Sequence, residues 1–187
     1  MSELERYIQS KVNLSEEEIR EIVQAFEETT FKNDQAIIQK GQYVTKYFFI
    51  ATGGVRIVIE TPEREITAWL IFENHFFSDL EALRSGQVSR AKMVAIEDTR
   101  IYSIDAHTMH AFYNRFPQWQ AFGRKMMEDA FLTVVDSLIS FQTMDAEARY
   151  LRLLEQSEAI HRVPLKQLAS YLGITPNSLS RIRRNIR

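Results

Sequence analysis

Four polar side chains near the C-terminal end have the chemistry to hydrogen-bond to nucleic-acid bases. Asn177, Arg181 and Arg184 fall on one face of a helix that advances by about 100° per residue, and Ser180 lies beside them. A guanidinium can donate two hydrogen bonds to guanine, and an amide can pair with adenine in the same way. Spacing and chemistry together predict a helix that reads base edges in the major groove of DNA.

The opposite face of this predicted helix is apolar. Leu179, Ile182 and Ile186 share it, so the helix can bury one side and present polar groups on the other. Hydroxyl groups near the helix start are suited to phosphate contacts. The predicted DNA-binding residues are Thr175, Asn177, Ser178, Ser180, Arg181 and Arg184.

A shorter helix and a tight turn are predicted before the reading helix. Leucines at three positions of residues 165–172 form an apolar stripe, and Ala169 is small where two helices must cross closely. Gly173 stands where the first helix has to stop, Thr175 can cap the second helix, and Pro176 fits its first turn. A helical hairpin with a solvated basic face is the alternative, but this coincidence of signals favours a DNA-binding helix-turn-helix.

Charge is divided unevenly along the chain. From Arg162 to Arg187 there are six basic residues and no acidic one, whereas the rest of the chain carries 17 basic and 25 acidic residues. A short basic end on an acidic body is typical of a separate nucleic-acid surface. A solvated run of charge has the same composition, so charge alone does not decide between the two.

The N-terminal part of the chain changes its pattern at Phe31. Residues 3–29 have helical spacing, and Ser15 with Glu18 matches a capping box. Short β-rich runs follow, and Gly or Pro turn signals separate several of them. The runs are 36–38, 47–51, 55–59, 65–71, 93–96 and 100–104. Many short strands at close spacing predict an antiparallel barrel or jelly roll.

A long helix is predicted from Pro117 to about Phe141. Apolar residues recur along it at spacings of 4, 3, 4 and 3, the a/d seam of a coiled coil. They are Met127, Phe131, Val134, Leu138 and Phe141. A core helix that lies on the barrel is the alternative. Further apolar residues on the other faces favour a helix that packs on its own domain and on a second copy of the chain.

Several classes of protein and site are excluded by composition. The chain has no cysteine, which rules out disulfides, thiolate metal sites and cysteine-held iron–sulfur clusters. No apolar run approaches the roughly 20 residues of a membrane span, and the first residues are unlike a signal peptide, so we expect a cytoplasmic protein. His107 and His110 lack a nearby third ligand, so we predict no metal and no cofactor. The sequence shows no catalytic motif, so we do not expect an enzyme.

With these motifs in this order, the chain resembles the family of the cyclic-AMP receptor protein and the fumarate–nitrate regulator (Crp/Fnr). The resemblance extends over nearly the whole chain and includes Gly41, the 47–56 strand pair, the 76–80 segment, Glu97-Asp98 and Pro117. It implies an α+β fold with a β-roll sensor in residues 1–116, a dimerisation helix in 117–143 and a helix-turn-helix domain in 144–187. It also implies a homodimer that binds double-stranded DNA, with half-sites about 34 Å apart, and RNA polymerase as a partner.

The effector pocket of that family is altered in this sequence. Where members that bind cyclic AMP have Gly-Glu, this chain has Ser78 and Asp79; where they have Arg-Ser-Ala, it has Ser89, Arg90 and alanine. One place along a strand turns a side chain to the opposite face, so the arginine is expected to leave the pocket. The polar pair on the long helix corresponds here to Val134 and Val135. The resemblance therefore implies a degenerate pocket that does not bind cyclic AMP.

The DNA-reading end also departs from the family. Asn177 stands where the family commonly has glutamate, whereas Arg181 matches the family arginine, so a different operator sequence is expected. Only five residues follow Ile182, too few for the hairpin wing that often follows the reading helix. The sequence thus predicts a homodimeric transcription regulator. The alternative is a sensor whose DNA binding is controlled by a cyclic nucleotide or another anion; the effector, the operator and the sign of regulation stay open.

Overall fold

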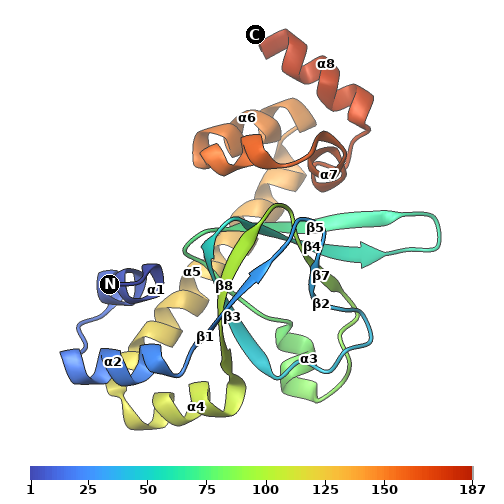
Figure 1. Cartoon of the computed structure of the whole chain (residues 1–187). Helices are drawn as coiled ribbons and strands as arrows, with labels where there is room; N and C mark the ends of the chain where they lie inside the picture. The colour runs from blue at the N-terminus through green and yellow to red at the C-terminus, as the bar shows by residue number, and fades with distance from the viewer. Residues whose placement is uncertain (187) are drawn as a thin grey trace.

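The computed structural model describes residues 1–186, and Arg187 of the basic end lies outside the described residues. Eight strands of this part form two facing four-stranded antiparallel sheets (Figure 1). Their strand orders, β1-β8-β3-β6 and β2-β7-β4-β5, are those of a jelly roll, which confirms the predicted α+β class with a β-roll. The strands are β1 (Glu27–Phe31), β2 (Ala36–Ile38), β3 (Lys46–Thr52), β4 (Gly54–Glu60), β5 (Glu65–Phe72), β6 (Phe76–Phe77), β7 (Lys92–Ala95) and β8 (Thr99–Asp105).

Helices cover one end of the roll and extend beyond it (Figure 1). Two precede β1, one lies between β6 and β7, and the rest follow β8. They are α1 (Glu3–Lys11), α2 (Glu16–Gln24), α3 (Leu80–Ser85), α4 (Ala106–Arg115), α5 (Pro117–Thr143), α6 (Ala146–Gln156), α7 (Leu165–Tyr171) and α8 (Pro176–Ile186), with a short 3-10 helix, η1 (Glu158–Arg162), between α6 and α7. The long helix expected from Pro117 is α5.

The predicted helical pattern over residues 3–29 is wrong at its end. Residues 27–29 belong to β1, which pairs with β8 from Glu27–Ser103 to Phe31–Thr99. The backbone hydrogen bonds of this strand come from a partner far along the chain, and that tertiary pairing overrides the local helical spacing. The capping box predicted at Ser15 is present and starts α2.

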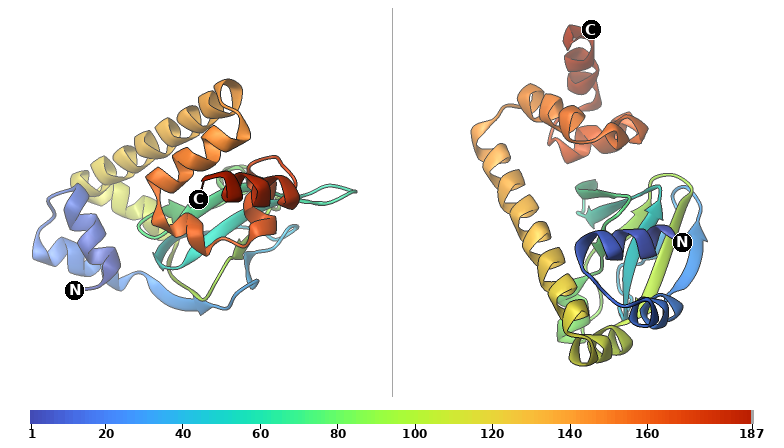
Figure 2. Two further views of the ribbon diagram at one scale, coloured as in Figure 1. Left: turned by 90° about the horizontal axis from the view of Figure 1, so that it is seen from above. Right: turned by 90° about the vertical axis from the view of Figure 1, so that its left-hand side faces the viewer.

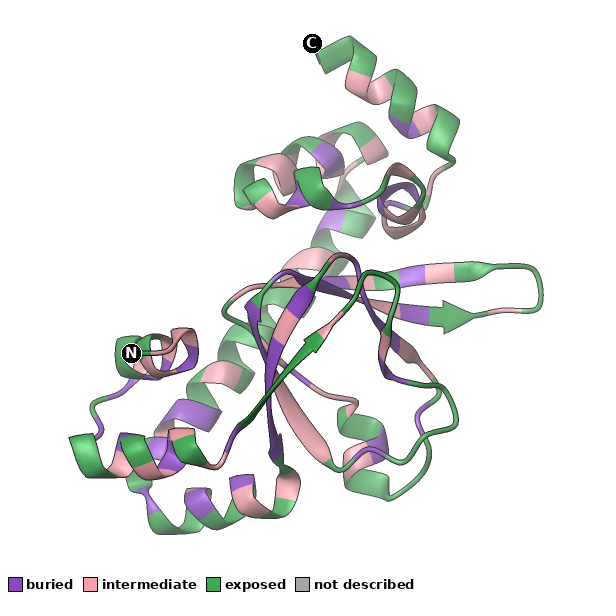
Figure 3. Cartoon of the chain, in the orientation of Figure 1, coloured by how far each residue is buried: buried purple, intermediate pink, exposed green. Residues whose placement is uncertain are grey.

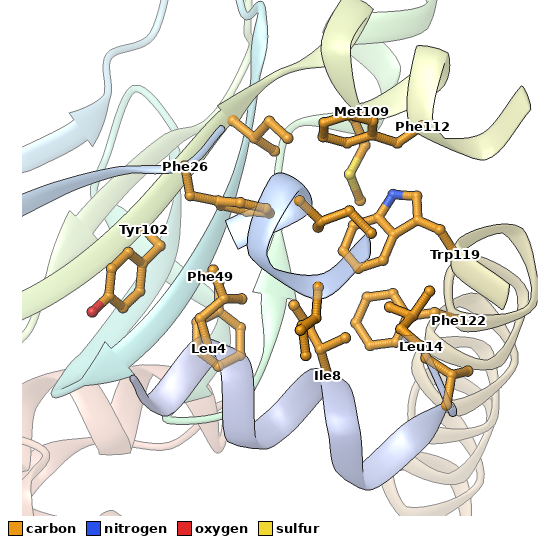
Figure 4. Packing of buried hydrophobic residues seen from close by; sticks show 14 of the residues in the cluster. Leu4, Ile8, Leu14, Phe26, Phe49, Tyr102, Met109, Phe112, Trp119 and Phe122 are labelled. Carbon is orange, nitrogen blue, oxygen red and sulfur yellow. The ribbon is translucent and has the colours of Figure 1, made fainter. Parts of the chain in front are cut away.

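The first turns of α5 are fixed in the largest apolar cluster. Trp119 and Phe122 have no exposed surface, and their stacked ring centroids lie 4.6 Å apart. They pack in a cluster with Leu4 and Ile8 of α1 and with Phe49 of β3 (Figure 4). This cluster joins α1, α2, α4 and the start of α5 to one face of the sheet that contains β3.

A second apolar cluster fills the roll. Phe48 and Ile50 point to it from β3, because side chains alternate between the two faces of a strand. The rings of Phe48 and Phe77 stack with centroids 5.2 Å apart. The buried members are Ile37, Ile38, Val44, Ile50, Val55, Phe77, Ala82, Met93, Ala95 and Ile101.

Beyond Met126, α5 leaves the core. Every position from Met127 to Val134 is exposed (Figure 3). At its far end the helix carries α6, η1, α7 and α8, which we call the head (Figure 2). Arg152 of α6 donates hydrogen bonds to Ser140 and Asp136 of α5 and fastens the head to it. Across residues 1–186, no helix combines the length and the apolar character that a membrane crossing requires.

Gly53 is predicted to be essential to the β3–β4 turn. Its φ is +93°, and an added Cβ would lie 2.8 Å from Thr99 Cα and 2.9 Å from the carbonyl oxygen of Asp98. Gly53→Ala should therefore lower the free energy of unfolding by about 2–4 kcal/mol, from left-handed strain and backbone overlap. Urea unfolding measures it.

Gly86→Ala is the matched control. Gly86 also has a positive φ, +67°, but an added Cβ meets nothing within 4 Å. Only the conformational cost remains, about 1 kcal/mol. Equal losses in the two variants would contradict the packing account of Gly53.

Candidate DNA-reading helix and sensor pocket

Helix α8 exposes the polar face that the sequence predicts. Asn177, Ser180, Arg181 and Arg184 are all exposed, whereas Leu179 is fully buried in the head. Within the described residues, neither Arg181 nor Arg184 takes part in an ion pair. The two guanidinium groups are therefore available to a ligand from outside the chain.

The turn before α8 has the geometry expected of it. Gly173 has φ +72°, and the amide of Ile174 donates to the carbonyl of Ala169 at 3.0 Å. The hydroxyl of Thr175 accepts from the backbone amide of Ser178 at 3.1 Å and lies 3.0 Å from the Ser178 hydroxyl. Both hydroxyls thus serve first in the helix cap, and Ser178 is only half-exposed.

Arg183 has a structural role that the sequence analysis does not identify. Its Nε donates to the Tyr150 hydroxyl at 3.0 Å, and its guanidinium lies 5.6 Å from the centre of the same ring. The signal was present in the spacing, because Arg183 lies four residues after Leu179 and thus near the apolar face. Arg183 fixes α8 on α6 and does not share the exposed face.

The polar residues at the candidate effector pocket are hydrogen-bonded to one another or to the backbone. The Ser89 hydroxyl donates to Asp79 Oδ2 at 2.6 Å, and Asp79 Oδ1 accepts from the amide of Ala82 and caps α3. The Ser78 hydroxyl donates to the carbonyl of Lys46 at 2.8 Å. Ser89 is only 2% exposed. These groups satisfy each other and the backbone without any ligand.

Arg90 lies outside the roll, though for a different reason from the one predicted. It stands in the loop before β7 and not in a strand; the backbone of Ser89 is held by hydrogen bonds with Gly41 and Gln42. The side chain of Arg90 is 84% exposed, and its Nη1 lies 3.5 Å from Glu81 Oε1. This guanidinium faces solvent at the surface of the molecule.

The predicted seam of α5 is open to solvent throughout. All five seam residues are exposed, and Phe131 is the most exposed of them at 66%. The sequence analysis missed Leu132 and Ile139, which are exposed too; their spacing of seven was the signal. Val134 lies on this open surface, whereas its neighbour Val135 is half-buried. The seam residues are Met127, Phe131, Val134, Leu138 and Phe141.

The two histidines of α4 do not form a metal site in this structure. His110 Nε2 lies 3.3 Å from the Tyr47 hydroxyl, and its ring stacks on Tyr113. Among the residues that the structure describes, no three His, Cys, Asp or Glu side chains gather as metal ligands would.

Comparisons with known proteins agree with this architecture. The family model of the cyclic nucleotide-binding domain matches residues 28–116, from β1 to the residue after α4. No curated protein matches the sequence. Among solved structures, FixK2 from Bradyrhizobium japonicum superimposes with a TM-score of 0.74 at 17% identity, over 86% of this chain and 84% of FixK2.

Two further solved structures have the same fold. The c-di-GMP responsive global regulator CLP of Xanthomonas campestris has a TM-score of 0.70 at 13% identity, over 92% of this chain and 91% of CLP. A mutant of CooA from Carboxydothermus hydrogenoformans has a TM-score of 0.69 at 18% identity, over 88% of this chain and 78% of CooA. Residues 28–116 therefore match the model of the cyclic nucleotide-binding domain, and the chain has the fold of these solved structures.

Proposed function

We propose that this chain is a homodimeric, sequence-specific DNA-binding transcription regulator whose effector pocket has lost the capacity to bind cyclic AMP. The observation that carries the proposal is the exposed stripe of amide and guanidinium groups on α8. The supporting features are the open apolar seam of α5 and the self-satisfied polar groups of the roll. Residues 1–116, 117–143 and 144–187 act as the sensor, dimerisation and DNA-binding regions.

DNA reading rests on three side chains. Asn177 and Arg181 lie in the first half of α8, where a reading helix meets base edges, and Arg184 follows one turn later. Arginine suits the N7 and O6 acceptors of guanine, and asparagine suits adenine. Ser180 lies beside them, and Thr175 and Ser178 at the helix cap are placed to meet phosphate oxygens.

Dimerisation follows from the exposure of α5. A monomer that leaves Met127, Phe131, Val134, Leu138 and Phe141 in water exposes a continuous apolar surface, which marks an interaction site in soluble proteins. The heptad spacing fits a second copy of the same helix. A two-fold dimer along α5 carries both heads at one end and presents two α8 helices to DNA half-sites about 34 Å apart.

The effector pocket lacks the residues that hold cyclic AMP in the family members that bind it. Cyclic nucleotides carry a phosphate anion, and a buried anion needs a cationic or hydrogen-bonding partner. Arg90 is outside the roll, Asp79 adds a carboxylate, and Ser89 is already bonded to it. The regulator CLP is described as c-di-GMP responsive, so a ligand-controlled sensor is the second candidate function. The bonding of Ser78, Asp79 and Ser89 favours a regulator without a nucleotide ligand or a cofactor.

The remaining parts of the proposal follow from this function. A DNA-binding regulator of this fold acts in the cytoplasm and works through contacts with RNA polymerase.

Arg181→Ala should weaken operator binding and relax base preference. The loss of a bidentate contact to guanine costs about 1–3 kcal/mol for each half-site. The operator is first selected from random duplexes by the wild-type protein, and affinities are then compared by fluorescence anisotropy at several salt concentrations.

Arg20→Ala is the control for this variant, because Arg20 is an exposed arginine on α2, away from the head. It should leave affinity and base preference unchanged. If Arg181→Ala leaves operator affinity and base preference unchanged, Arg181 does not read bases as proposed.

Phe131→Glu should convert the dimer to a monomer. A charge placed in the apolar seam of both copies has to lose its hydration without a partner, and like charges meet across the two-fold axis. Because Phe131 is 66% exposed within one chain, folding of the monomer should be preserved. Sedimentation equilibrium measures the change.

Tyr43→Glu matches this substitution at another exposed aromatic, 69% exposed on the roll, and should stay dimeric. A wild-type protein that is monomeric at tens of micromolar, or a Phe131→Glu variant that still dimerises, would contradict the seam.

Cyclic AMP should not stabilise the protein. A ligand present at 100 times its dissociation constant raises the free energy of unfolding by about 2.7 kcal/mol, which a thermal melt detects easily. We expect no shift of Tm with cyclic AMP at millimolar concentration. A clear rise would show that the roll still holds an anion and would overturn the degenerate pocket.

A further inference from the structure

The head rests on the roll as well as on α5. Helix α7 lies on strand β5, and the right-hand view of Figure 2 shows the head above the end of the roll. Leu70 and Ile96 of the roll join the apolar core of the head in one continuous cluster. The head side of this contact includes Ile160, Val163 and Leu168, each 3% exposed or less. Apolar burial of this kind is favourable and holds two surfaces together.

An ionic clamp closes the edge of this contact. Nη1 and Nη2 of Arg162 each lie 2.7 Å from one carboxylate oxygen of Glu73, and Nη1 lies 3.1 Å from Glu97 Oε1. The amide of Gly53 donates to the same Glu73 carboxylate at 2.9 Å. A bidentate guanidinium–carboxylate pair is directional, so it fixes orientation as well as distance.

The charge state of the clamp is stable at neutral pH. Burial raises the pKa of Glu73, but hydrogen bonds from Arg162 and from backbone amides, with the charge of Arg162, bring the pKa below its usual value. The hydrogen bond to Glu73 raises the pKa of Arg162. Both partners therefore stay charged across the physiological range.

A backbone hydrogen bond adds a third point of attachment. The amide of Thr67 on β5 donates to the Ser170 hydroxyl of α7 at 3.0 Å, and Thr67 is 3% exposed. Beside it, the rings of Trp69 and Tyr171 meet edge to face with centroids 6.3 Å apart. With Arg152 on the α5 side, the head is held on two faces.

These contacts use α7 and η1 and leave the reading face of α8 uncovered. Asn177, Arg181 and Arg184 stay exposed while α7 is docked. Figure 1 shows α8 on the side of the head that is turned away from the roll. Docking to the roll and access to DNA are thus compatible in one conformation.

We infer that the roll itself positions the head for DNA, through the Arg162–Glu73–Glu97 clamp and the Leu70–Ile96 patch, so that the two reading helices keep a fixed geometry without an effector. Arg162, Glu73 and Leu70 are positioning residues, since none of them lies on the reading face. The inference rests on the proposed dimeric DNA-binding function. The contact between the head and the roll then holds the head in its DNA-binding orientation, as a bound ligand would otherwise do.

The test compares binding to one half-site with binding to two. A head that moves freely still binds a single half-site, but it loses the advantage of presenting both reading helices at the correct spacing. Full-length protein is titrated, without nucleotide, against its selected full site, against one half-site, and against the full site lengthened by about 5 base pairs, half a helical turn.

Glu73→Gln and Leu70→Ala test the clamp and the patch from the roll side, which leaves the folded core of the head largely intact. Glu73→Gln keeps an oxygen for the Gly53 amide, removes the charge, and replaces one of the two oxygens that accept from Arg162 with an amide donor. Each should lower full-site affinity by about three- to tenfold with half-site affinity unchanged, and each should tolerate the lengthened site better than the wild type. Glu17→Gln on α2 and Ile59→Ala on β4 are matched controls and should leave all three affinities unchanged.

The outcomes separate the two proposals. If the wild-type protein does not bind the half-site, the proposed function itself is wrong. Half-site binding that is intact in all variants, with an unchanged ratio of full-site to half-site affinity in Glu73→Gln and Leu70→Ala, overturns the positioning role. A wild-type full-site affinity that rises more than threefold on addition of cyclic AMP or c-di-GMP overturns effector-free positioning.

Discussion

The architecture depends on the long helix α5, whose first turns lie in the core and whose far end carries the head. The fully buried Trp119 and Phe122 hold the first turns of α5 in the core, and they fix the direction in which the remaining turns leave it. From Met127 onward the helix has no roll to cover it, yet it carries apolar residues at heptad spacing. In the proposed dimer this exposed surface meets a second copy, and the head is placed both by α5 and by its contacts with the roll.

The roll keeps the architecture of a nucleotide-binding domain while its polar groups serve the fold. Asp79 caps α3 and accepts the Ser89 hydroxyl, so one carboxylate fulfils two structural roles. The space between the sheets is filled by aliphatic and aromatic side chains. Gly53 connects the roll to the head through the Glu73 carboxylate.

Elements that obey a local period could be predicted from the sequence, and contacts between distant segments could not. The face of α8 and the seam of α5 follow from helical spacing alone, and both are exposed where the sequence predicts. Strand β1 was missed because its hydrogen bonds come from β8, and the role of Arg183 was not identified although its place near the apolar face was visible in the spacing. The Arg162–Glu73 pair joins residues that are 89 positions apart in the chain, and no local sequence pattern predicts such a contact.

Hydroxyl-radical footprinting of the purified, nucleotide-free protein on its selected operator tests the central claim most directly. The account predicts two protected patches with two-fold symmetry, centred about 10 base pairs apart, because two docked heads reach successive major grooves on one side of the duplex. A single protected patch, or protection that develops only after a cyclic nucleotide is added, would contradict it.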